Sequence, residues 1–86
     1  MTVWKYRLGP FEEQFFMLPA GAQILTAQLQ NGAEFLWVLV NPDAPLTDCR
    51  YIRRVLTGEK TGSNLGKYIA TIQNDWFVTH WFEVAK

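Results

Sequence analysis

A single dipeptide, Asn31-Gly32, constrains the fold of this 86-residue chain more than any other feature. It stands between two runs rich in strand-forming residues, Ile24 to Gln30 and Ala33 to Val40. Both central residues of a type I′ turn need a positive φ, which asparagine and glycine adopt readily. The dipeptide therefore predicts a β-hairpin with a two-residue turn.

The predicted turn fixes which residues of the hairpin oppose one another. Counting outward places Leu25 opposite Val38 and Ile24 opposite Leu39. Strand side chains alternate, so the hairpin has two faces. The face expected to form the core is aliphatic and comprises Leu25, Ala27, Leu29, Leu36, Val38 and Val40. The mixed face comprises Ile24, Thr26, Gln28, Phe35, Trp37 and Leu39. It suits packing within the protein, a subunit contact or a ligand platform.

The rest of the chain repeats this pattern of short β-rich runs separated by turn signals. Strands are expected over residues 3–8, 13–18 and 50–57, although the helix-favouring composition of 13–18 leaves a helix as the alternative there. A second hairpin is expected around Asn74-Asp75, with Ile72 opposite Phe77 and Tyr68 opposite Trp81. The chain is thus predicted to be one all-β domain over residues 1–86. We expect an antiparallel meander of about seven short strands, forming a small sandwich or a partly open barrel.

Charge and cysteine content exclude several classes of protein. Eight basic and eight acidic residues give a formal net charge of zero, which argues against nucleic-acid binding through bulk charge. The single cysteine, Cys49, excludes a disulfide framework and a cysteine-based metal site, and it fits a reducing compartment. No apolar run approaches the ~18 residues of a membrane span. A soluble cytoplasmic protein is the expectation.

No residue pattern predicts catalysis, a cofactor or a metal site. His80 is the only histidine, and the sequence does not place it beside Cys49 as a base beside a nucleophile. The stretch Gly62 to Lys67 is one residue short of a phosphate-binding loop, and Tyr68 stands where serine or threonine would bind magnesium. We therefore expect His80 and Cys49 to be structural and the protein not to be an enzyme.

One cationic cluster suggests a ligand site. Guanidinium groups bind phosphate or carboxylate through paired hydrogen bonds, and aromatic rings stack on bases. A solvated strand edge, with the arginines paired to Asp43, Asp48 or Glu59, is the alternative. The candidate ligand-binding residues are Arg50, Tyr51, Arg53, Arg54, Lys60, Lys67, Phe35 and Trp37.

Much of the chain resembles a family of small uncharacterised proteins found in tailed bacteriophages and prophages. The stretches that carry the resemblance are Val3–Tyr6, Leu18–Ala22, Gln28–Gly32, Leu36-Trp37, Val40–Ala44, Thr57-Gly58, Gly66–Ile69 and Phe77–Glu83. The resemblance implies an accessory phage product that acts in the host cytoplasm and has no assigned catalytic motif.

Together, the residues and the resemblance predict a small non-enzymatic binding protein that inhibits a host antiviral defence by sequestering a nucleotide-type signal. The alternatives are a protein–protein inhibitor or adaptor that docks on a host enzyme, and a minor virion structural protein. Aromatic residues make up 15% of the chain, more than a small monomer easily buries, so a homo-oligomer is expected. Neither a membrane nor bulk nucleic acid is expected as a partner.

Overall fold

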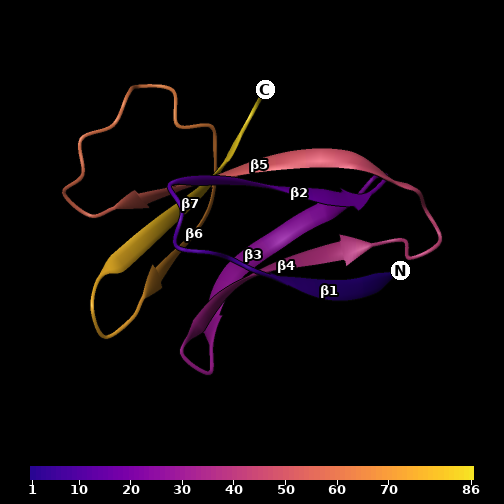
Figure 1. The fold of residues 1–86 in the computed structure, drawn as a ribbon, viewed down its shortest axis with the longest axis horizontal. Helices are drawn as coiled ribbons and strands as arrows, with labels where there is room; N and C mark the ends of the chain where they lie inside the picture. The colour runs from indigo at the N-terminus through magenta and orange to yellow at the C-terminus, as the bar shows by residue number, and fades with distance from the viewer.

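The computed structural model describes residues 1–86 and contains seven strands and no helix (Figure 1). The strands are β1 (Thr2–Arg7), β2 (Glu13–Pro19), β3 (Gln23–Gln30), β4 (Ala33–Val40), β5 (Leu46–Leu56), β6 (Lys67–Gln73) and β7 (Val78–Val84). The all-β prediction is confirmed, and the segment for which a helix was the alternative is strand β2. No helix is present that could cross a membrane.

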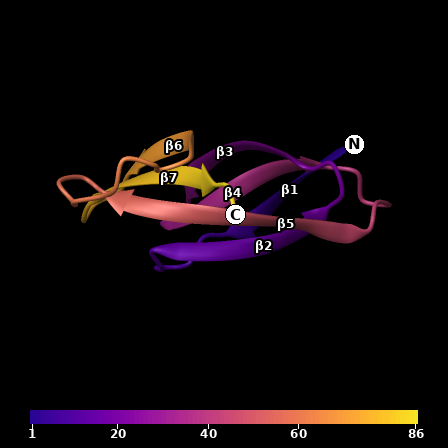
Figure 2. The same ribbon diagram turned by 90° about the horizontal axis from the view of Figure 1, so that it is seen from above.

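The strands form two antiparallel sheets that pack as layers of a sandwich. One sheet has the order β1-β4-β3 and the other the order β2-β5-β7-β6. Figure 2 shows the layers edge-on, with the β6 edge turned toward the β3 edge. The strands do not form the predicted meander, because only the β3–β4 and β6–β7 pairs join strands consecutive in sequence. The other pairings, β1–β4, β2–β5 and β5–β7, join distant segments, and their partners cannot be inferred from turn signals.

The β3–β4 hairpin has the predicted turn, with positive φ at Asn31 and Gly32. The predicted register holds as far as the pair Thr26 and Trp37. A β-bulge then inserts one residue, so that Ile24 pairs with Val38 instead of Leu39. The prediction that Leu25 belongs to the core is wrong: its side chain is 44% exposed, and Ile24 packs against the core instead. Leu29, also predicted for the core, is 41% exposed near the turn.

The β6–β7 hairpin differs from its predicted turn. Gln73 pairs with Val78, so the connection holds four residues rather than two. The Asn74 side chain explains the longer loop, because its Oδ1 accepts hydrogen bonds from the amides of Trp76 and Phe77 at 2.8 and 3.0 Å. Lengthening the turn by two residues does not change the face of the sheet on which a side chain lies. Most inward-facing residues of this hairpin are therefore those predicted. Two residues that the predicted pairing placed on the core face are exposed, Phe77 at 47% and Tyr68 at 57%. The predicted pair of Tyr68 with Trp81 is wrong, because a β-bulge between Tyr68 and Ala70 pairs Tyr68 with Phe82 instead.

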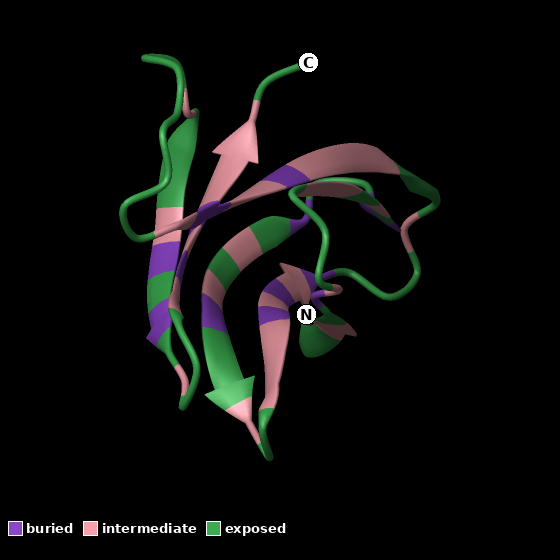
Figure 3. Ribbon diagram, turned by 60° about the vertical axis from the view of Figure 1, so that its left-hand side comes forward, coloured by how far each residue is buried: buried purple, intermediate pink, exposed green.

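The core lies between the sheets and draws on both. Figure 3 shows buried and exposed bands alternating along β6, as expected for a strand with one covered face. Trp81 of β7 is the largest fully buried side chain, and Leu36 and Val38 of β4 face it from the other sheet's inner side. The buried cluster comprises Leu8, Leu18, Ala22, Ala27, Leu36, Val38, Val40, Ile52, Ala70, Ile72 and Trp81.

Candidate functional site

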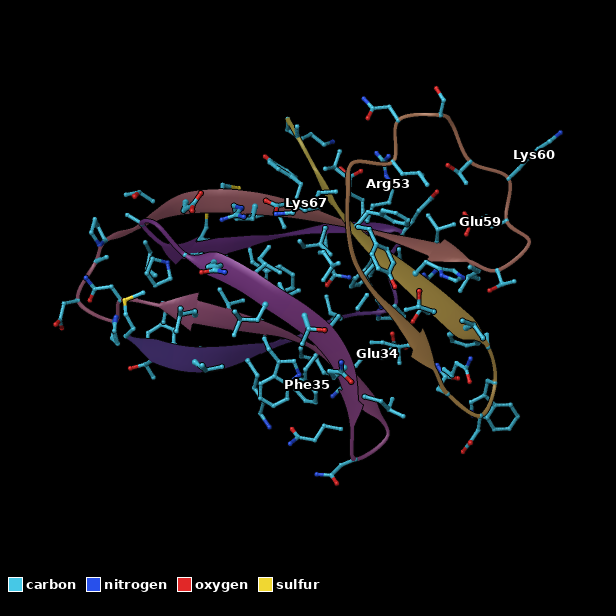
Figure 4. The ribbon with its side chains drawn as sticks, turned by 180° about the vertical axis from the view of Figure 1, so that it is seen from behind. Glu34, Phe35, Arg53, Glu59, Lys60 and Lys67 are labelled. Atoms are coloured by element: carbon cyan, nitrogen blue, oxygen red, sulfur yellow. The ribbon has the colours of Figure 1, made fainter.

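The structure does not gather the eight predicted ligand-binding residues into one site. Figure 4 shows Phe35 near the β3–β4 turn, whereas Arg53 and Lys60 lie at the far side, beside the loop that follows β5. Phe35 and Trp37 share the outer face of the β1-β4-β3 sheet. Tyr51 and Arg53 share the outer face of the other sheet, as their common alternation on β5 predicts. Of the remaining four, Arg50 and Lys67 line one cavity, Arg54 lines a second, and Lys60 borders a third opening beside Arg53.

Arg50 and Lys67 line the first cavity, of about 350 Å³, between β3 and β6. The Arg50 guanidinium is already occupied. It forms a two-pronged pair with the Glu83 carboxylate, and its Nη1 donates to Asp48 Oδ2 at 3.1 Å and to the Ala22 carbonyl at 2.9 Å. The Glu83 carboxylate holds the pKa of Arg50 above its ordinary value. Arg50 is therefore a clamp between β5, β7 and the β2–β3 turn, and a phosphate would have to displace two carboxylates.

Arg53 is also paired with a carboxylate. Its Nη2 donates to Glu13 Oε2 at 3.0 Å, and the other oxygen of Glu13 pairs with Lys86. Hydrogen bonds from Lys86 and Arg53 lower the pKa of Glu13 below its ordinary value of 4.5. Of the anionic partners proposed for the cluster, Asp48 is confirmed for Arg50, whereas Arg53 pairs with Glu13, which sequence did not indicate. Lys60, beside Arg53 at a shallow opening, extends into solvent (Figure 4).

A pH dependence follows from Glu13. Glu13→Gln is expected to lower the free energy of unfolding at neutral pH by removing the ionic part of both pairs. A depressed folded-state pKa gives a stabilisation that is complete above the unfolded value of about 4.5 and is lost as pH falls through the folded value. Urea unfolding of both proteins across this range should show their difference shrinking on acidification. Glu12→Gln, which removes no ion pair, should leave stability within ~0.5 kcal/mol at every pH. A Glu13→Gln difference that persists in acid would contradict the assignment.

Two predicted residues, Phe35 and Trp37 of β4, lie on a surface that we call the aromatic–basic face. Three residues that were not predicted complete it: Lys5 and Arg7 of β1 and Gln28 of β3. The pairing of β1, β4 and β3 arranges these side chains in two rows across the sheet. Arg7 and Gln28 flank Phe35, and Lys5 flanks Trp37. All five point away from the sandwich interior, because alternate β4 residues Leu36 and Val38 point into it.

Cations lie close to both rings of the aromatic–basic face. Lys5 Nζ is 4.7 Å from the Phe35 ring centroid and 5.8 Å from that of Trp37, and the Arg7 guanidinium carbon is 6.0 Å from Phe35. The two ring centroids are 6.4 Å apart. Lys5 is held in place by a hydrogen bond to Gln30 Oε1 at 2.6 Å. The rings and cations thus form one continuous surface.

No carboxylate shares this face. The residues that point outward from β1, β3 and β4 include no aspartate or glutamate, since Glu34 points inward with Leu36. The four ion pairs of the structure involve Arg50, Arg53 and Lys86, and none involves Lys5 or Arg7. Lys5 and Arg7 therefore keep their charge available for a ligand.

Lys5 and Arg7 are the functional candidates that sequence reasoning missed. Alternation along residues 3–8 put Lys5 and Arg7 on one side of a strand, which was a usable signal. Lys5 and Arg7 lie beside Phe35 and Trp37 because β1 pairs with β4. These segments are about 30 residues apart, and no local sequence pattern predicts that they pair.

His80 lies elsewhere, on the outer face of the β2-β5-β7-β6 sheet. Its Nε2 is 2.7 Å from Thr57 Oγ1 and its Nδ1 is 3.0 Å from Thr71 Oγ1. Both ring nitrogens are engaged by hydroxyl groups, so the pairing of His80 with Cys49 as base and nucleophile is not formed.

Comparison with known proteins places the chain in a family. Residues 1–86 match a family described as Domain of unknown function (DUF7352). No curated protein and no solved structure matches the chain. Because the match spans every residue of the sandwich, the chain belongs to the DUF7352 family, an uncharacterised domain family.

Proposed function

We propose that this protein binds a nucleotide on the aromatic–basic face and does so without catalysis. The observation that supports this most directly is the combination of two aromatic rings and two cations on an open sheet surface with no carboxylate. Bases stack on aromatic side chains, and lysine and arginine pair with phosphate. A carboxylate at the same place would repel the phosphate, and none is present.

In this proposal the phosphate is not bound by the arginine cluster. Arg50 and Arg53 are each neutralised by a glutamate, so a phosphate gains less from them than from Lys5 and Arg7, which have no anionic partner. In this proposal Phe35 and Trp37 hold the base, and Lys5 and Arg7 hold the phosphate.

The biological role we propose is sequestration. The resemblance of the sequence to phage proteins supports a protein made during infection that removes a nucleotide-type signal from the host cytoplasm and so inhibits an antiviral defence. Stoichiometric capture requires a binding surface and no catalytic groups, which agrees with the residues of the face.

Isothermal titration calorimetry against a panel of nucleotides tests the proposal. The panel comprises cyclic dinucleotides, cyclic trinucleotides, ADP-ribose derivatives and single mononucleotides. We expect saturable binding of at least one member, weakening as salt rises because the phosphate contacts are exposed. Heat near zero across the panel at low salt would end the proposal.

Substitutions assign the binding to the face. Phe35→Ala is expected to weaken the affinity for the bound nucleotide by about 5–150-fold, since stacking one base is worth ~1–3 kcal/mol. Arg7→Gln should weaken it as well and should reduce its salt dependence. Phe15→Ala, which removes an aromatic side chain that is 61% exposed on the other sheet, is the matched control and should bind as the wild type does. Equal binding by all three variants would place the ligand elsewhere.

A protein–protein inhibitor or adaptor is the second candidate. The outer face of the β2-β5-β7-β6 sheet exposes Phe15, Met17 and Tyr68, with Phe15 beside Tyr51 at a centroid distance of 6.0 Å. Exposed apolar patches mark interaction surfaces, and a second copy of the chain or a host enzyme would cover this one. Zero heat with nucleotides, together with loss of a stoichiometric host partner in Phe15→Glu, would favour this function over nucleotide binding.

A further inference from the structure

A second cavity, of about 210 Å³, opens at the end of the sandwich beside the β3–β4 turn. It meets the aromatic–basic face only at Arg7, and its lining combines apolar walls with charged groups. The side chains that matter are Leu8, Glu34, Arg54, Phe77 and Trp81. They come from β4, β5, β7 and two loops, so the cavity is a product of the folded sandwich.

Arg54 is the only arginine directed inward without a carboxylate. It pairs across the β5–β7 ladder with the buried Trp81, which places both side chains on the inner face. Its Nε is enclosed and has no hydrogen-bond partner, and no ion pair involves its guanidinium. Enclosing the Nε–H of a charged guanidinium without a partner costs free energy. An oxyanion bound in the cavity would remove that cost through paired hydrogen bonds.

Glu34 determines which oxyanion fits. Its Oε1 accepts hydrogen bonds from Thr79 Oγ1 at 2.6 Å and Trp81 Nε1 at 2.9 Å, and its Oε2 accepts one from Asn74 Nδ2 at 3.3 Å. All three donors are neutral, so the carboxylate charge is not cancelled by a contacting cation. The Glu34 carboxylate therefore repels a doubly charged anion such as hydrogen phosphate more strongly than it repels a singly charged carboxylate.

The remaining cavity walls set the size and polarity of the ligand. A volume of about 210 Å³ corresponds to roughly seven water molecules in the liquid, enough for a carboxylate with a short side chain. Phe77, which is 47% exposed, offers apolar contact to that side chain, with the buried Trp81 behind it. Arg7 also borders the cavity, and its guanidinium lies toward Phe35, so it adds positive charge at the rim.

We propose that this cavity binds a small monocarboxylate that carries a short apolar group, with the carboxylate on Arg54 and the apolar group against Phe77. The site goes beyond nucleotide binding on the aromatic–basic face and does not depend on it. Isobutyrate has this chemistry and serves as the probe, and inorganic phosphate and acetate are the comparison anions.

An NMR titration of isotope-labelled full-length protein tests the site, because the enclosed Arg54 Nε–H and the Trp81 indole N–H report from inside the cavity. Isobutyrate at millimolar concentration is expected to shift both signals saturably. Phosphate should bind about tenfold or more weakly at equal ionic strength, and acetate should be weaker than isobutyrate because it lacks the apolar contact. Glu34→Gln should reduce the difference in affinity between isobutyrate and phosphate, because it removes the negative charge that repels the dianion.

Matched variants separate a site from a surface effect. Arg54→Gln should abolish saturable binding, whereas Arg53→Gln, on the outer face of the same strand, should leave it unchanged. Phe77→Ala lies on an exposed loop that tolerates change, and it should reduce the preference for isobutyrate over acetate even where Arg54→Gln is poorly folded. Absence of saturation at Arg54, or phosphate binding as tightly as isobutyrate to the wild type, would overturn the proposal.

Discussion

Trp81→Ala is expected to lower the free energy of unfolding by about 3–5 kcal/mol, the largest effect of any single substitution considered for this protein. Trp81 is 1% exposed and belongs to the core cluster that joins the two sheets. Removing its side chain loses apolar burial and leaves a cavity in a core of few residues. A domain of this size has a total stability of only about 4–13 kcal/mol, so a large share of it depends on this side chain.

Part of this loss is polar. The indole Nε1 of Trp81 donates to Glu34 Oε1 at 2.9 Å and to Thr79 Oγ1 at 3.1 Å, joining β7 to β4 across the sandwich. Trp81→Ala removes the donor, and the half-buried Glu34 carboxylate keeps the hydrogen bonds from Thr79 and Asn74, so the loss of this bond accounts for about 1 kcal/mol of the total. Trp81→Phe should show mainly this second cost, since it keeps most of the apolar volume.

Urea unfolding followed by circular dichroism measures these differences, and the chain supplies a control. Trp76 is 88% exposed in the β6–β7 loop, so Trp76→Ala should change stability by no more than ~0.5 kcal/mol. A Trp81→Ala variant as stable as Trp76→Ala would contradict the placement of Trp81 at the centre of the core.

Local chemistry made the hairpins predictable, and long-range pairing did not. Asn31-Gly32 has a steric preference that acts within four residues, and the first pairs of the β3–β4 ladder follow from it. The bulge at Leu25 was not predictable, because it depends on how β3 packs beside the other sheet. At Asn74-Asp75 the dipeptide indicated a turn, but the Asn74 side chain bonds two amides and lengthens it.

The candidate sites show the same limit. Phe35 and Trp37 were identified from the mixed composition of one hairpin face. The charge state of the arginine cluster was not, because Glu83 reaches Arg50 from a strand 33 positions later and Glu13 reaches Arg53 from one 40 positions earlier. Glu34 left one signal: it is an acid at an inward position of a strand face that is otherwise aliphatic. Such a residue requires donors from another element, and here they come from β7 and its preceding loop.

Gly66 stands directly before β6 with a φ of +97°. A β-carbon there would lie 2.1 Å from the Glu83 carbonyl oxygen and 3.1 Å from Val84 Cα. Gly66→Ala therefore adds a backbone clash to the cost of a left-handed conformation. We expect a loss of about 2–5 kcal/mol, from ~1–2 kcal/mol for the conformation and ~1–3 kcal/mol for the overlap.

The clash falls where β6 meets β7, at the residue whose side chain holds Arg50. If the strands separate to relieve it, the Glu83–Arg50 pair and the cavity between β3 and β6 are disturbed together. Gly32→Ala is the matched control, because Gly32 has a similar φ of +80° and no atom within 4 Å of an added β-carbon. Gly32→Ala should lower the free energy of unfolding by only ~1–2 kcal/mol, the cost of the left-handed conformation. Chemical denaturation of the two variants isolates the contact, and equal losses would show that β6 does not lie against Glu83 as the β6–β7 register requires.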